Sequence, residues 1–99
     1  MHNIDYSIIC CLYNEKQIIE KKFNNFLEQA RSSPFKYEIL VCDNHSNDGT
    51  YELLKEIELK NPENIKFIFN SSNLGKGGSI KKCASLSKGK YILVFDIDA

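Results

Sequence analysis

Tyr91-Ile92-Leu93-Val94-Phe95-Asp96-Ile97-Asp98-Ala99 is the stretch of this 99-residue chain that indicates its fold. Five apolar or aromatic residues lead into two aspartates, which predicts a strand buried on both faces with carboxylates at its C-terminal tip. Side chains at positions i and i+2 of a strand point the same way. Because two adjacent anions repel, Asp96 and Asp98 predict a site for a hard cation, Mg²⁺ or Mn²⁺. The alternative is an ordinary solvated strand end followed by a turn.

Three earlier apolar runs, at 6–12, 37–42 and 65–69, are each followed by a segment with helical spacing. Helices of 10–15 residues between apolar strands predict right-handed crossovers and an open parallel sheet, in the order β-α-β-α-β-α-β. We expect Asn14 and Gln17 to form a capping box at the start of the first helix. Asn61-Pro62 should end the second helix, and Gly89 should cap the C-terminus of the third.

Polar residues follow each expected strand, at the end of a parallel sheet where ligands bind. After the second strand, Asp43 and Asn44 could contact the ribose or base of a nucleotide, or could only form a turn. Tyr13, after the first strand, could stack on a base or simply pack at the rim of the core. The residues at 48–50 are expected to have structural roles, with a positive φ at the glycine. The remaining polar cluster is the glycine-rich loop at 70–78.

Charge and composition favour an α/β domain without a nucleic-acid partner. The formal net charge is zero, and no run approaches the roughly 18 apolar residues of a membrane span. Positions 64–95 contain six lysines and no Asp or Glu. Such a segment could attract a diphosphate or an anionic membrane surface, or could be a solvated face. The N-terminus lacks the pattern of a signal peptide.

The four cysteines, Cys10, Cys11, Cys42 and Cys83, have neither the spacing of a zinc site nor that of a disulfide framework. Three of them lie in apolar strand-like runs. We therefore expect reduced, buried thiols that act as small hydrophobic side chains in a cytoplasmic protein.

Four motifs in this order resemble family 2 glycosyltransferases from about Tyr6 onward: Tyr-Asn-Glu, Asp-Asn-x-Ser-x-Asp-Gly-Thr, Asn-Leu-Gly-Lys-Gly and Asp-x-Asp. The resemblance implies the Rossmann-like half of a GT-A fold, which binds a nucleoside-diphosphate sugar and a divalent metal for inverting transfer to a hydroxyl. It implies that Asp98 binds the metal, with Asp96 beside it near ribose and sugar. The other residues that it implies in nucleotide-sugar binding are Tyr13, Glu15, Asp43, Asn44, Lys76 and Lys81.

The chain departs from the family pattern in three ways, the first being Cys11, which stands where a Thr or Pro is common. Many members have a second Asp where this chain has Asn44, so the base preference stays open. Members also continue beyond the Asp-x-Asp strand into an acceptor-binding half that supplies the general base. We therefore expect residues 1–99 to be a donor domain without a catalytic base, inactive alone. The acceptor of the whole protein would be a saccharide or a lipid-linked molecule, used in the cytoplasm or at the cytoplasmic face of a membrane.

Two alternatives remain at this point. The sequence Val94-Phe95-Asp96-Ile97-Asp98 also resembles the nucleophile motif of haloacid-dehalogenase phosphatases. That motif, however, usually opens a domain and continues Gly-Thr. The other alternative is a non-catalytic α/β module that binds a nucleotide or a partner.

Overall fold

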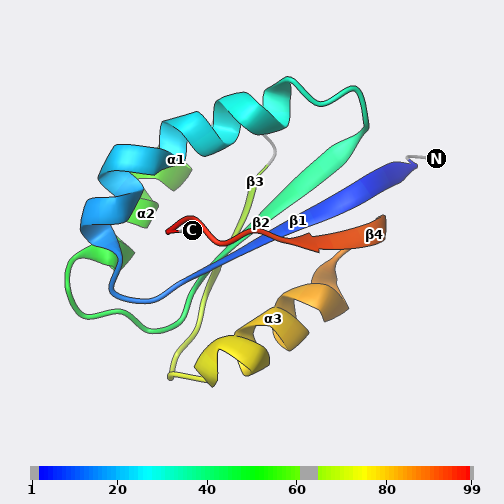
Figure 1. Cartoon of the computed structure of the whole chain (residues 1–99). Helices are drawn as coiled ribbons and strands as arrows, with labels where there is room; N and C mark the ends of the chain where they lie inside the picture. Colours follow the sequence, from blue (N-terminus) through cyan, green and yellow to red (C-terminus); the bar gives the residue numbers. More distant parts are fainter. Residues whose placement is uncertain (1–2, 61–64, 99) are drawn as a thin grey trace.

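The computed structural model describes residues 3–60 and 65–98 as one parallel sheet with helices on both faces (Figure 1). The strands pair in the order β3-β2-β1-β4, all parallel. This arrangement confirms the predicted fold class and element order. The elements are β1 (Ile4–Leu12), α1 (Lys16–Arg31), β2 (Tyr37–Asp43), α2 (Thr50–Leu59), β3 (Ile65–Phe69), α3 (Gly75–Leu86) and β4 (Gly89–Val94).

The core is divided between the two faces of the sheet because side chains alternate along each strand. On one face, Phe23 and Phe26 of α1 and Leu54 of α2 pack against the sheet. On the other face, Cys83 of α3 packs against Ile9 and other inward side chains. Figure 1 shows α1 and α2 together on one side of the sheet and α3 on the other.

The strand order reverses beside β1. The chain moves outward from β1 to β2 and β3, and α3 then returns it to the opposite side of β1, where β4 pairs. In open parallel sheets the ligand crevice lies beyond the carboxyl ends of the strands at such a reversal. A ligand site is therefore expected at the carboxyl ends of β1 and β4.

The expected burial of the last strand on both faces is wrong for the described residues. Tyr91 to Val94 are 43–58% exposed, and β4 pairs only with β1 within 3–60 and 65–98. The apolar run predicted a central strand, but β4 stands at an edge of this sheet. Phe95 and Ile97, just beyond it, do join the core, and the Phe95 ring stacks on Phe26.

Two expected helix ends are also wrong, because groups distant in sequence determine these boundaries. Asn14 has a φ of 50°, and its side chain accepts a hydrogen bond from Asn47 N rather than capping α1. The amide of Lys16, at the start of α1, instead donates to Asp48 Oδ2. Helix α3 ends before Ser87, and Gly89 begins β4. The stop predicted at 61–62 lies outside the described residues.

The amino end of the sheet contains a closed polar cluster that the sequence did not predict. Glu38 of β2 is 6% exposed and accepts hydrogen bonds from Ser7 Oγ at 2.6 Å and from Lys88 N. Lys66 Nζ lies 3.1 Å from its other oxygen. Burial alone would raise the pKa of Glu38, but these partners outweigh it and lower the pKa.

Gly89 completes this amino-end cluster by donating its N–H to Ser7 Oγ at 2.7 Å. A Cβ at Gly89 would overlap the backbone of Tyr6 and Ser7. Only glycine therefore allows β4 to approach β1 this closely.

None of the helices in the described segments is at once long and apolar enough to cross a bilayer.

Candidate functional site

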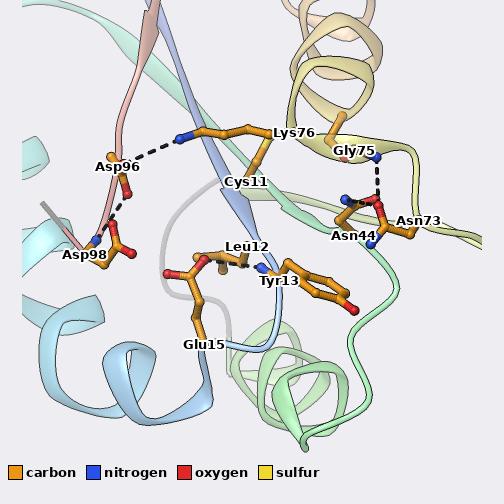
Figure 2. Close-up of a pocket in the computed structure, with 11 residues that line it drawn as sticks. Cys11, Leu12, Tyr13, Glu15, Asn44, Asn73, Gly75, Lys76, Asp96 and Asp98 are labelled. Atoms are coloured by element: carbon orange, nitrogen blue, oxygen red, sulfur yellow. Dashed lines mark hydrogen bonds and ion pairs between the residues drawn. The ribbon is translucent and has the colours of Figure 1, made fainter.

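A cavity of about 290 Å³ lies at the strand reversal, open to solvent (Figure 2). Its walls come from the end of β1 and the turn after it, the start of α3, and the residues after β4. Six of the eight predicted site residues line it: Tyr13, Glu15, Asn44, Lys76, Asp96 and Asp98. The remaining lining residues are Cys11, Leu12, Asn73, Gly75 and Ser79.

The two predicted residues outside the cavity are Asp43 and Lys81. Asp43 is 1% exposed, and its Oδ1 accepts a hydrogen bond from Ser46 Oγ at 2.5 Å. Lys81 is exposed on α3. The binding roles of Asp43 and Lys81 therefore stay predictions.

Asp96 and Asp98 lie close together just beyond β4, in a turn and not in the extended strand that the i, i+2 argument assumed. Asp98 N donates to Asp96 Oδ1 at 3.4 Å, and Lys76 Nζ lies 3.4 Å from Asp96 Oδ2. The hydrogen bond between the two carboxyls raises the pKa of Asp98 and lowers that of Asp96. Two carboxyl groups thus face one lysine at this point of the cavity.

Glu15 adds a third carboxylate to the same cavity, from the turn after β1. Its Oε1 accepts a hydrogen bond from Tyr13 N at 3.3 Å. Its Oε2 is buried and has no hydrogen-bond partner among the described residues. Burial raises the pKa of Glu15, and the charges of Asp98 and Asp96 raise it further.

These residues fit a hard divalent cation. Three carboxylates and one lysine line the cavity, and one buried carboxylate oxygen lacks a partner. Mg²⁺ and Mn²⁺ prefer such oxygen ligands, and a cation would offset the repulsion among them.

Asn44 holds the glycine-rich loop against the end of β2. Its Oδ1 accepts hydrogen bonds from Leu74 N at 2.8 Å and from Asn70 Nδ2 at 3.1 Å. Its Nδ2 donates to Asn73 Oδ1 at 2.9 Å, and Gly75 N donates to the same oxygen. Asn44 is thus a structural residue at the wall of the cavity.

The turn after β1 is fastened to the loop after β2. Asn14 N donates to Ser46 Oγ at 2.9 Å, and Glu15 N donates to Thr50 Oγ1 at 3.1 Å. Asp48 Oδ1 accepts from both the N–H and the hydroxyl of Thr50. Gly49 has a φ of 100°. The predicted structural roles of residues 48–50 are therefore confirmed.

The sequence interpretation did not single out Asn73, Gly75 or Ser79. The first two belong to the Asn-Leu-Gly-Lys-Gly motif, so that motif was the available signal. Ser79 lies one helical turn further along α3, fully buried, and accepts a hydrogen bond from Asn70 Nδ2.

The comparisons with known proteins agree with this geometry. The model of the family described as "Glycosyl transferase family 2" matches residues 7–99. An uncharacterized glycosyltransferase of Methanocaldococcus jannaschii is 34% identical over 93% of this chain. The dolichyl-phosphate beta-glucosyltransferase of Dictyostelium discoideum is 34% identical over 97% of it. These matches favour the glycosyltransferase resemblance over the phosphatase alternative.

Solved structures share the fold. A mannosyltransferase from Pyrobaculum calidifontis, in complex with GDP-Man and Mn²⁺, superposes with a TM-score of 0.81 at 23% identity, over all of this chain and 29% of that one. S. aureus TarS in complex with UDP-GlcNAc superposes with a TM-score of 0.70 at 23% identity, over 96% of this chain and 27% of that one. The chain covers 31% of the length of each of the two curated relatives.

Proposed function

This chain belongs to glycosyl transferase family 2, and from that membership we propose that it is the donor-binding part of an inverting glycosyltransferase. Its ligand would be a nucleoside-diphosphate sugar, held together with Mg²⁺ or Mn²⁺. The observation that carries the proposal is the meeting of Asp96, Asp98 and the partly unpaired Glu15 in one cavity at the strand reversal.

Asp98 and Asp96 are the proposed metal ligands. A divalent metal bound there would supply Lewis-acid stabilisation of the charge that develops on a departing diphosphate. Glu15 would add negative charge beside them, and Lys76 would contact the diphosphate. Because Lys76 already lies against Asp96, it would exchange one anionic partner for another when the donor binds.

The nucleoside would lie against the exposed ring of Tyr13, near Asn44. We propose that the buried Asp43 supports the nucleoside site indirectly, through the loop that contains Ser46. Lys81 would approach the ligand from the exposed face of α3. The solved neighbours were captured with GDP-Man and with UDP-GlcNAc. GDP and UDP are therefore the first nucleotides to test on this chain.

Transfer itself needs a base that deprotonates the acceptor hydroxyl. None of the residues proposed here has that role. We place the base and the acceptor site in the part of the relatives' length that this chain does not cover. Residues 1–99 would then bind donor without transferring sugar. The acceptor would be a saccharide or a lipid-linked molecule, presented in the cytoplasm or at the cytoplasmic face of a membrane.

Calorimetric titration tests the donor site directly. UDP, GDP and TDP are titrated into the chain with Mn²⁺, and again with EDTA. We expect metal-dependent binding of one nucleotide, and a loss of at least about tenfold in affinity for Asp98→Asn, which corresponds to roughly 1.4 kcal/mol.

Asp5→Asn is the matched control, because Asp5 lies at the opposite end of the sheet and accepts a hydrogen bond from Lys36 N. It should bind like the unmodified chain. Equal affinity in Asp98→Asn and Asp5→Asn would contradict the proposed metal site.

A further inference from the structure

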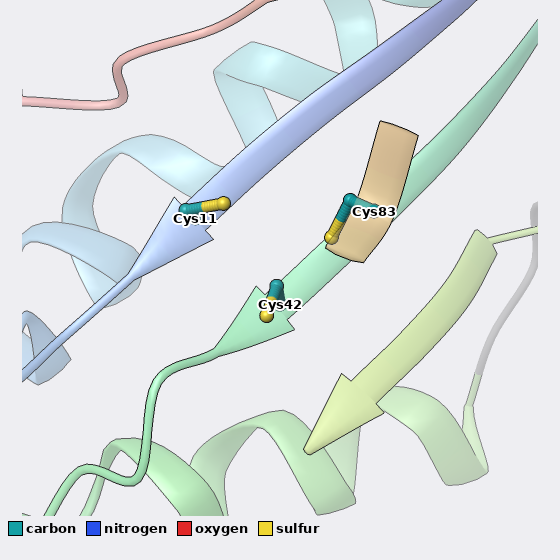
Figure 3. Close-up of side chains that lie close together, drawn as sticks. All are labelled: Cys11, Cys42 and Cys83. Carbon is teal, nitrogen blue, oxygen red and sulfur yellow. The ribbon is translucent and has the colours of Figure 1, made fainter. Parts of the chain in front are cut away.

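Three of the four cysteines converge on one point, although the sequence separates them widely. The sulfur atoms of Cys11, Cys42 and Cys83 all lie within 4.8 Å of one another (Figure 3). Cys11 and Cys42 are directly paired in register on β1 and β2, and Cys83 reaches them from α3. The sheet register and the helix above it therefore create a cluster that spacing along the chain does not reveal.

The fourth cysteine shows that this convergence is specific to one face of the sheet. Cys10 is adjacent to Cys11 but packs in the core on the other face, under α1 and α2. It is fully buried and acts as a small hydrophobic side chain. Cys10 thus serves as an internal reference for a thiol without sulfur neighbours.

The distances are close to those of a thiolate metal site. Sulfurs bound to one zinc at about 2.3 Å lie roughly 3.8 Å apart in tetrahedral geometry. The longest separation in the cluster would therefore have to shorten by roughly 1 Å, which small side-chain rotations can provide.

Access and surroundings also suit an ion. Cys42 and Cys83 are fully buried, whereas Cys11 is half-buried and lines the cavity described above. An ion could enter through the cavity and meet Cys11 first. The buried hydroxyl of Ser79 hydrogen bonds to Cys42, and the charge of Lys82 acts on the same thiol. Hydrogen bonds with Cys11 and Cys83, together with these two groups, lower the pKa of Cys42, whereas hydrogen bonding within the cluster raises the pKa of Cys11 and that of Cys83.

We propose that Cys11, Cys42 and Cys83 together bind one thiophilic d¹⁰ cation, Zn²⁺ or Cu⁺, behind the wall of the cavity. Each thiol that becomes a ligand releases its proton to water. Three sulfurs complete a trigonal site for Cu⁺, and the Ser79 hydroxyl or a water from the cavity supplies the fourth position that Zn²⁺ prefers. Soft sulfur ligands distinguish this site from the oxygen site at Asp96 and Asp98.

The test uses the intact chain, kept reduced by a phosphine under anaerobic conditions. Cd²⁺ serves as the spectroscopic probe for Zn²⁺, through its sulfur-to-metal charge-transfer absorption. Cu⁺ is added in a second arm from a competing chelator. Native mass spectrometry counts bound ions and released protons. We expect one ion per chain, and the arm with the tighter binding identifies the cation.

Variants then assign the ligands. Cys42→Ser should weaken binding by about a hundredfold or more, since loss of a ligand exceeds the effect of a supporting residue. Cys10→Ala should keep the unmodified affinity. If Cys42→Ser does not fold, judged by circular dichroism, Cys11→Ser at the cavity wall takes its place with the same expectation.

Two results would overturn the proposal. One is the absence of thiolate absorption with Cd²⁺ together with no uptake of Cu⁺. The other is equal ion binding in the folded cysteine variant and in Cys10→Ala.

Discussion

The two ends of the sheet each place a lysine beside a carboxylate, with opposite results. At the amino end, Glu38 is buried, every oxygen has a partner, and its pKa is lowered. At the carboxyl end, Glu15 keeps an unpaired oxygen among like charges, and its pKa is raised. The first arrangement stabilises the fold, whereas the second leaves negative charge for a ligand to neutralise. Pairing of the carboxylate, more than the presence of a lysine, separates a structural cluster from a binding site.

The largest expected effect comes from Gly89→Ala at the amino end. The new Cβ would overlap the backbone of Ser7 and Tyr6, so β4 would have to move from β1. We expect a loss of about 3 kcal/mol in the free energy of unfolding, measured by urea denaturation.

Gly77→Ala is the matched control near the cavity. A Cβ there meets no atom within 4 Å, and alanine favours a helix. Its stability should rise by about 0.5–1 kcal/mol. Equal losses of stability in Gly89→Ala and Gly77→Ala would contradict the proposed difference between the two ends of the sheet.

Glu38→Gln should cost about 2 kcal/mol at neutral pH, because the charged acceptor of several hydrogen bonds is lost. Because the pKa of Glu38 is lowered in the folded state, its charged form stabilises the fold, and this stabilisation is complete above the ordinary glutamate pKa of 4.5. The stabilisation is lost as the pH falls through the lowered pKa. Urea denaturation from pH 7 downward should therefore show a weaker acid dependence in Glu38→Gln. Glu56→Gln, at an exposed position of α2, should keep the original pH profile.

Glu15→Gln should separate binding from stability. Removing a carboxylate that is crowded by Asp96 and Asp98 costs the fold little, so the melting temperature should stay the same or rise slightly. Metal-dependent nucleotide affinity should fall by about tenfold, or roughly 1.4 kcal/mol. If Glu15→Gln lost as much stability as Glu38→Gln and kept its nucleotide affinity, Glu15 would be a structural residue and not part of the binding site.

The smallest expected effect on stability is that of Lys76→Met. Its ion pair with Asp96 is exposed, and such pairs contribute about 0–1 kcal/mol. Nucleotide affinity should nevertheless fall, and its dependence on salt should weaken. Lys81→Met in the same titration distinguishes the lysine in the cavity from the one outside it. An equal fall in nucleotide affinity in both variants would indicate that Lys81 also contacts the donor.

The sequence predicted the parallel fold and the order of its elements well, because both depend on local patterns. Apolar runs, helical spacing and the polar residues after each strand are all readable along the chain. The burial of β4 was not predictable in this way, since it depends on which strands lie beside it. Asp48 at the start of α1 was missed for the same reason, because the capping residue comes from another loop.

The cysteine cluster and Glu38 show the same limit. Positions 11, 42 and 83 meet only through strand register and the placement of α3. Glu38 reads as a polar residue in a strand, and the groups that pair with it come from β1, β3 and the residue before β4.

The pairing of β4 with β1 has a consequence for the order of folding. The hydrogen bond from Gly89 to Ser7 joins residues 82 positions apart, so one edge of β1 stays unpaired until the chain has been synthesised past Gly89. Closing so long a loop is entropically costly and slows folding. Asp96 and Asp98 reach Glu15 only after this step. In a refolding experiment, nucleotide binding should therefore recover later than helical circular dichroism.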